Sequence, residues 1–230
     1  RGLPVAVVSI APITCIQFSA NSTSLCAIQA TRGKAQCSDS ERMFAGVFAG
    51  VVSAVVQSPC QLVEVNQQNF GGTVSSTARA VIREHGVAGL FRGVSMTMVR
   101  EGVFCCSYIA LQPMLQAMLH KRRPELSENA AVAGSSVATG VLGAAISHPA
   151  DTFKTRLQGG MFNTGPDQVR RVRDVARQLQ MSPGGLLSGC YAGFTPRCFR
   201  LICCTYIYSN LNAFFEERLR QWLGASKRTP

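Results

Sequence analysis

The sequence predicts an all-α membrane protein, because its composition, its long apolar segments and an internal repeat all favour that class. Of its 230 residues, 47% are hydrophobic and only 15% are charged. The mean hydropathy of +0.14 is high for a soluble protein and low for a membrane protein. We therefore expect membrane-spanning helices that are lined partly with small and polar residues.

Five segments are long enough to cross a bilayer as helices. They lie near residues 2–28, 41–68, 93–119, 128–158 and 193–222, and each exceeds the roughly 20 residues that a bilayer requires. Two shorter segments, 73–84 and 166–180, combine apolar and basic residues at helical spacing. This pattern predicts amphipathic helices that lie on the membrane surface.

An internal repeat organises these segments. The stretch SPCQLVEVNQQ returns 90 residues later as SHPADTFKTRLQ, so that Pro59 corresponds to Pro149. LFRGVSMTMVREG returns after 100 residues as CYAGFTPRCFRLI, and RGLPVAVVSIAPI is a third copy. We therefore divide the chain into the second half of one repeat (1–40), a second repeat (41–127) and a third (128–230).

These repeated motifs resemble those of the mitochondrial carrier family over the whole chain. The odd-numbered helices of that family end in a P-x-[DE]-x-x-[KR]-x-[KR]-x-x-Q pattern, which is matched in full by Pro149, Asp151, Lys154, Arg156 and Gln158. The even-numbered helices follow an aromatic-[KR]-G turn, matched by Phe91-Arg92-Gly93 and more loosely by Tyr191-Ala192-Gly193.

The resemblance implies a pseudo-threefold bundle of six transmembrane helices in the mitochondrial inner membrane, which the chain would cross several times. It also implies alternating access by a monomer. By this comparison the chain contributes five of the six helices. We expect it to be a fragment or a truncated gene product that lacks the first helix.

The proline motif predicts a gate at one mouth of the bundle. Pro59 and Pro149 each remove one helical hydrogen bond and should bend their helices, so that the charged helix ends converge. Ion pairs formed there near water are weak enough to break. The resemblance implies that this gate faces the matrix, and the matching residues are Asp151, Lys154, Arg156, Gln158, Gln61, Glu64 and Gln68.

Charges within a membrane span are rare and usually functional. In the even-numbered helices they are Arg100, Glu101, Arg197 and Arg200. Arg100 and Arg200 each follow a glycine by seven residues, which places both roughly 10 Å into the membrane. The resemblance implies that they line the central binding site together with positions near Ser9, Ile13 and Gln17.

Two classes of solute are consistent with these charges. Guanidinium groups at Arg100 and Arg200 would hold carboxylates and Glu101 would hold an ammonium, which favours an amino-acid-like or carnitine-like zwitterion. The stretch TPRCFRL is more similar to carriers of di- and tricarboxylates, which are the alternative.

A protein of another class, a carrier-like scaffold that does not transport, is a further alternative. The places where the family has an acid and a base at the second mouth read Asn21-Ser22, Gln112-Pro113 and Asn212-Ala213. An enzyme is not expected, because no histidine has a positioned nucleophile or carboxylate partner.

Metal, cofactor and nucleic-acid sites are not expected either. The ten cysteines form no CxxC pattern, and we interpret them as small core residues in a reducing compartment. The net charge of +11 is spread without interleaved aromatic residues, which favours anionic lipid over nucleic acid as a partner. Lipid phosphates, those of cardiolipin by the resemblance, are expected at helix N-termini beside Gly71, Gly72, Gly93 and Gly193.

Small residues predict close approach between neighbouring helices. Gly46 and Gly50 share one helical face, and Ser136 and Gly140 repeat this spacing 90 residues later. Such small-xxx-small faces let helix backbones come close together in a membrane.

Overall fold

The computed structural model describes residues 3–33, 36–160, 171–182 and 184–226, and within them it is built of helices without strands. The long helices are α1 (Leu3–Arg32), α2 (Asp39–Phe70), α6 (Glu128–Gly159) and α9 (Phe194–Ser226). One further span consists of α4 (Val94–Cys105), η2 (Cys106–Leu111) and α5 (Gln112–Arg122). The shorter elements are α3 (Val74–His85), η1 (Val87–Phe91), α7 (Val172–Gln180) and α8 (Gly185–Cys190). The prediction of an all-α fold is confirmed.

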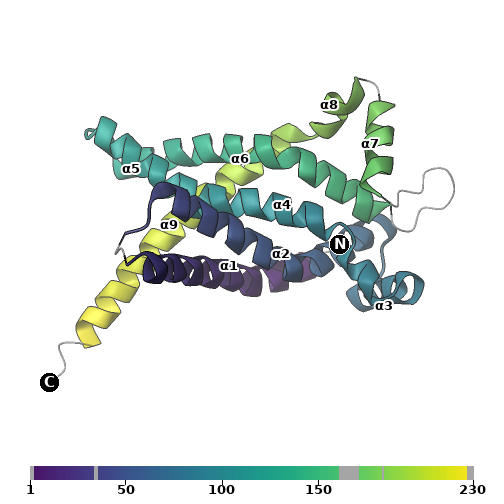
Figure 1. The fold of residues 1–230 in the computed structure, drawn as a ribbon, viewed down its shortest axis with the longest axis horizontal. Coiled ribbons are helices and arrows are strands. Elements are labelled where there is room, and N and C mark those ends of the chain that lie inside the picture. Colours follow the sequence, from purple (N-terminus) through teal and green to yellow (C-terminus); the bar gives the residue numbers. More distant parts are fainter. Residues whose placement is uncertain (1–2, 34–35, 161–170, 183, 227–230) are drawn as a thin grey trace.

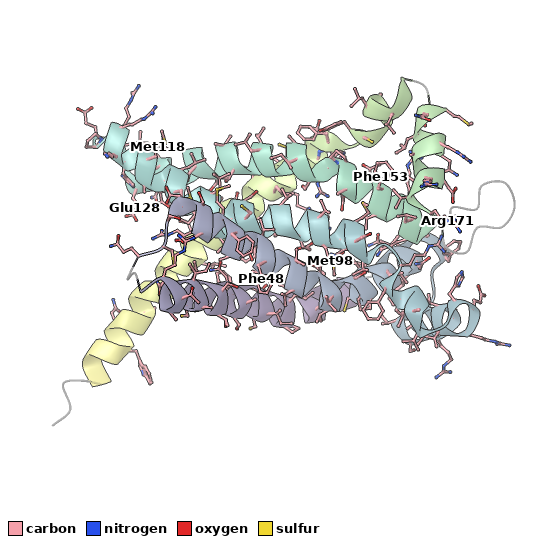
Figure 2. The ribbon with its side chains drawn as sticks, viewed as in Figure 1. Phe48, Met98, Met118, Glu128, Phe153 and Arg171 are labelled. Atoms are coloured by element: carbon pink, nitrogen blue, oxygen red, sulfur yellow. The ribbon has the colours of Figure 1, made fainter. Side chains whose placement is uncertain are left out.

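Three helical segments in the described part of the chain are long and apolar enough to cross a membrane: Asp39–Phe70, Val87–Arg122 and Glu128–Gly159. α1 and α9, with 30 and 33 residues, are of similar length. Large apolar side chains such as Phe44 and Phe48 remain exposed along α2 (Figure 2). Lipid rather than water accounts for such a surface.

Side-chain caps determine where α2 and α6 begin. Ser38 accepts a hydrogen bond from the Glu41 backbone N–H, and the Glu41 carboxylate accepts one from Ser38 N at 2.7 Å. This reciprocal capping box satisfies two amide groups that the first turn leaves open. At the start of α6, the Ser127 hydroxyl accepts a hydrogen bond from the Ala130 backbone N–H. Both helices continue through their prolines, Pro59 and Pro149, and the bend expected there stays a prediction.

The span after η1 differs from the expectation of one regular helix over 93–119. Residues Cys106–Leu111 form a π-helical turn between α4 and α5. A π turn contains one additional residue, so the side chains after it point in a different direction around the helix axis. Such turns are frequent at functional sites. Here Ser107, Tyr108 and Gln112 are buried in the bundle.

The predicted small-residue faces lie at close helix crossings. A Cβ atom on Gly50 would lie 2.2 Å from the Glu101 carbonyl oxygen, so the backbones of α2 and α4 are in direct contact. A Cβ on Gly140 would lie 2.8 Å from Cα of Ile202 on α9. Gly46 and Ser136 lie on the same two faces, as predicted.

The surface helices α3, α7 and α8 gather at one end of the bundle, where α2 and α6 also end (Figure 1). α3 buries Val81 against Leu62 of α2, and α7 packs Val175 and Leu179 against Leu157 of α6. The segment predicted at 73–84 is confirmed. Of the segment predicted at 166–180, residues 166–170 lie outside the described residues.

The cysteines are less buried than the sequence suggested. Cys105 and Cys190 are buried, whereas Cys15 and Cys26 on α1 are exposed and the other six are partly exposed. The expectation that all ten are core residues is wrong. Because a thiol behaves as a small apolar group, it is tolerated on the outer surface of an apolar bundle as well as in its interior.

Candidate functional site

A cavity of about 290 Å³ lies between α1, α2, α4 and α9. The residues that the sequence predicted for solute binding come from three of these helices and share this cavity. They are Ser9, Ile13, Gln17, Arg100, Glu101, Arg197 and Arg200. Two residues predicted for the gate, Gln61 and Glu64, also line it. The cavity therefore extends from the predicted binding residues to the predicted gate residues.

Several lining residues were missed by the sequence analysis. They are Ile10, Thr14, Gln57, Phe104, Leu201, Cys204 and Tyr208. They were missed because they carry no charge and do not match the positions that the family resemblance implies, and uncharged side chains are ordinary within a span. Spacing from the known arginines would have identified Phe104 and Cys204, which lie four residues beyond Arg100 and Arg200 and hence on the same helical faces.

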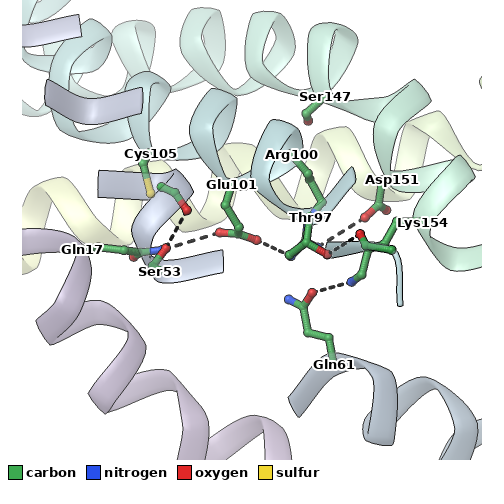
Figure 3. A network of polar contacts seen from close by, with 12 residues as sticks. Gln17, Ser53, Gln61, Thr97, Arg100, Glu101, Cys105, Ser147, Asp151 and Lys154 are labelled. Atoms are coloured by element: carbon green, nitrogen blue, oxygen red, sulfur yellow. Dashed lines mark hydrogen bonds and ion pairs between the residues drawn. The ribbon is translucent and has the colours of Figure 1, made fainter. Parts of the chain in front are cut away.

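One side of the cavity is tied together by hydrogen bonds from Gln17 (Figure 3). Its Nε2 donates to Ser53 Oγ at 3.2 Å and to Glu101 Oε2 at 3.5 Å. The Tyr108 hydroxyl, brought inward by the π turn, donates to Gln17 Oε1 at 2.7 Å. Gln17 thus uses both ends of its amide to connect α1 with α2, α4 and η2.

Tyr108 also belongs to an aromatic cluster beside the cavity. Its ring stacks on that of Tyr208, with ring centroids 5.0 Å apart, and lies 4.9 Å from the ring of Phe104. Phe104 and Tyr208 line the cavity themselves. An aromatic wall of this kind attracts a cationic group placed against its face.

The contacts of Gln17 continue through Glu101 into a network of buried charges (Figure 3). Arg100 forms ion pairs with its neighbour Glu101 and with Asp151 of α6, whose Oδ1 lies 3.3 Å from Nη1. Asp151 Oδ2 forms a second ion pair with Arg197 of α9. Arg197 additionally donates to Ser147 Oγ at 3.0 Å. One carboxylate therefore joins guanidinium groups from two different helices.

The two arginines that the sequence placed at equal depth differ in their environment. Arg100 is 8% exposed and is paired with two acids. Arg200 is exposed to the cavity, and within the described residues it makes no ion pair and no hydrogen bond. Of the two, Arg200 has donors available for a ligand without rearrangement.

The predicted gate residues are only partly brought together. Lys154 donates a hydrogen bond to Gln61, as the pairing of neighbouring helices predicts. Glu64 accepts from Gln68 of its own helix at 3.3 Å. Gln158 is buried and donates to the Arg92 carbonyl at 3.2 Å, whereas Arg156 is exposed.

The glycines predicted for lipid binding lie at helix starts. Gly71 and Gly72 precede α3, whose first turn is capped by Thr73. Gly93 caps α4 in the left-handed conformation, with φ 79° and without a side-chain cap, and Gly193 has φ 80° just before α9. Only glycine adopts this conformation without strain.

A bundle of long apolar helices around an interior cavity lined with arginines is the arrangement of a membrane solute carrier. The family described as mitochondrial carrier protein matches residues 36–123 and 127–222. The chain belongs to this family, whose members are transporters of the mitochondrial inner membrane and not enzymes.

Individual relatives differ in the solutes for which they are named. The chain is 30% identical to mitochondrial citrate transporter C of Aspergillus niger, over 68% of this chain and 53% of that protein. It is 26% identical to the succinate/fumarate mitochondrial transporter of Saccharomyces cerevisiae, over 99% of this chain and 74% of that protein. It is 24% identical to mitochondrial glutamate carrier 1 of Rattus norvegicus, over 83% of this chain and 69% of that protein. The chain thus spans about half the length of the first of these relatives.

Proposed function

We propose that the protein transports a small carboxylate-bearing metabolite across the mitochondrial inner membrane by alternating access. The observation that carries this proposal is Arg200, a cation exposed in the interior cavity, with no acid paired to it in the described part of the chain. An unpaired guanidinium that lines a cavity favours an anion that accepts two hydrogen bonds, which is the geometry of a carboxylate.

An amino-acid-like or carnitine-like zwitterion fits this cavity best. Arg100 and Arg197 are already paired with acids, which leaves Arg200 to hold a single carboxylate. Glu101, Glu64, Phe104 and Tyr208 line the same cavity, and acids together with aromatic faces favour an ammonium group. The glutamate carrier among the relatives is named for a zwitterion of this class.

A di- or tricarboxylate is the alternative solute. The citrate and succinate/fumarate transporters among the relatives support it by their names. Such a solute needs more than one guanidinium, so Arg100 or Arg197 would have to exchange its acidic partner for the solute.

Reconstitution in liposomes tests the proposal directly. We expect uptake of at least one labelled compound from a panel of amino acids, betaines, dicarboxylates and citrate, and we expect Arg200→Ala to abolish it. Arg83→Ala, the same substitution at an exposed arginine of α3 outside the cavity, is the matched control. Absence of uptake for the whole panel would support the scaffold alternative instead.

We also propose that the protein binds cardiolipin as a monomer at Gly71–Gly72, Gly93 and Gly193. Backbone N–H groups at helix N-termini attract phosphate, and the left-handed glycines that precede α4 and α9 support this assignment. Thermal unfolding in detergent tests it: cardiolipin should raise the melting temperature, whereas phosphatidylcholine should not. Native mass spectrometry should report one chain with bound lipid.

A further inference from the structure

We propose that Asp151 occupies a carboxylate site formed by Arg100 and Arg197, and that the carboxylate of an incoming solute takes its place. The inference deepens the proposed function and rests on it, since it assigns the second contact of the transported carboxylate. It also gives the predicted gate acid a direct connection to solute binding.

The geometry around Asp151 is that of a receptor for one carboxylate. Each of its two oxygens faces a different arginine: Oδ1 lies 3.3 Å from Arg100 Nη1, and Oδ2 is paired with Arg197 Nη1. The arginines come from α4 and α9, and the acid comes from α6. Two guanidinium groups that converge on the two oxygens of one carboxylate would hold a free carboxylate equally well.

Both arginines border the cavity that would hold the solute, although the Asp151 side chain is 24% exposed and those of Arg100 and Arg197 are 10% and 8% exposed. Arg100 and Arg197 both line the cavity, whereas Asp151 does not. A solute carboxylate can therefore make its first contact with either guanidinium before Asp151 leaves.

Exchange of one carboxylate for another keeps the charges of this buried network balanced. Insertion of an additional anion beside Asp151, or departure of Asp151 without replacement, would leave an uncompensated buried charge, which is strongly unfavourable. Substitution avoids both situations. The displaced Asp151 remains one helical turn from Lys154, because residues three apart on a helix are neighbours.

Displacement of Asp151 would also affect the gate. Asp151 belongs to the motif that is predicted to close one mouth of the bundle, and in the structure its ion pairs hold α6 to α4 and α9. When a solute carboxylate takes over both arginines, α6 loses these two ion pairs. Occupancy of the binding site would thus loosen the helix that carries the gate residues.

Chemical rescue by acetate tests the proposal without knowledge of the transported metabolite. Asp151→Ala removes the carboxylate and leaves room for a small anion. In the purified protein, the rate at which phenylglyoxal modifies Arg197 is measured by peptide mass spectrometry, with sodium chloride controlling for ionic strength. We expect faster modification of Arg197 in this variant. Acetate should then give half-maximal protection at about tenfold lower concentration than in the wild type, because it no longer competes with the Asp151 carboxylate for the arginines.

Glu101→Gln is the matched control. It also removes one negative charge beside Arg100, but Glu101 is not paired with Arg197, so the reactivity of Arg197 should stay at the wild-type level. Asp151→Glu should restore slow modification, because it returns a carboxylate. If Asp151→Ala does not fold, Asp151→Asn, of nearly unchanged size, is measured in the same way.

Two outcomes would overturn the proposal. One is an equal acetate requirement in wild type and Asp151→Ala; the other is an equal shift in Glu101→Gln, which would indicate a general effect of charge. Neither measurement requires transport. A failed uptake screen would therefore count against the proposed function alone, and failed acetate rescue against this inference alone.

Discussion

Lys154 on α6 donates a hydrogen bond to Gln61 on α2, and Gln61 is the residue that the 90-residue repeat aligns with Asp151. At this contact a neutral amide stands where the other repeat has a carboxylate. The link between α2 and α6 is therefore a hydrogen bond to a single charge and not an ion pair. Such a contact separates more readily than a buried ion pair of good geometry.

Gln61→Glu should convert this contact into an ion pair and stabilise the state seen here. We expect about 1 kcal/mol of additional stability and a slower initial rate of uptake, because the gate would open less readily. Melting temperature in detergent and uptake in liposomes measure the two effects. Gln180→Glu adds the same charge at an exposed position of α7 and should change neither. An accelerated rate in Gln61→Glu would contradict a gating role.

Arg100→Ala and Arg200→Ala should separate stability from binding. Both arginines line the cavity, so both variants should lose uptake, but only Arg100 is also buried in a network of charges. Its removal leaves Glu101 and Asp151 without a shared partner, which should lower the free energy of unfolding by roughly 3–5 kcal/mol. Arg200→Ala breaks no pair in the described structure and should change it by less than about 0.5 kcal/mol. Thermal unfolding compared with uptake distinguishes them, and undiminished uptake in Arg200→Ala would exclude the proposed site.

Gly50→Ala should disturb the contact between α2 and α4. The added Cβ would lie 2.2 Å from the Glu101 carbonyl oxygen, so the two backbones must move apart, at a cost of about 1–3 kcal/mol. Gly134→Ala is the control, because its Cβ would meet only a Leu119 methyl group at an ordinary 3.7 Å. We expect a lower melting temperature for Gly50→Ala alone. Equal melting temperatures would mean that the helices separate at this crossing without loss.

Glu101→Gln should discriminate between the two classes of solute. If the transported molecule carries an ammonium group, loss of the carboxylate should raise KM, because one cation-binding group disappears. If the molecule is a di- or tricarboxylate, KM should fall or stay constant, since Arg100 is partly released for an anion. The measurement is the concentration dependence of uptake for one zwitterion and one dicarboxylate.

The repeat predicted the long helices and part of the cavity lining. The lag of 100 placed Arg100 and Arg200 at equal depth, and the rarity of charges within spans together with the resemblance to the carrier family assigned these two and Arg197 to one cavity. The pairing of Asp151 with two of these arginines could not be predicted in this way. The sequence separation between repeats does not tell which side chains of different helices contact each other. The π turn at Cys106–Leu111 was also missed. Its one additional residue changes the phase of the helix, and Tyr108 reaches Gln17 only because of that change.

The direct contact of Gly50 with the Glu101 backbone has a mechanical consequence. α2 and α4 meet through main-chain atoms there, and α6 and α9 meet similarly at Gly140 and Ile202. Between α6 and the π turn η2 that follows α4, the corresponding approach, at Gly143, is to the side chain of Ser107, and side chains rotate far more easily than backbones shift. We therefore expect each of the two helix pairs to move as a rigid body. The two bodies should rotate relative to each other at the contact between α6 and the α4–η2 span.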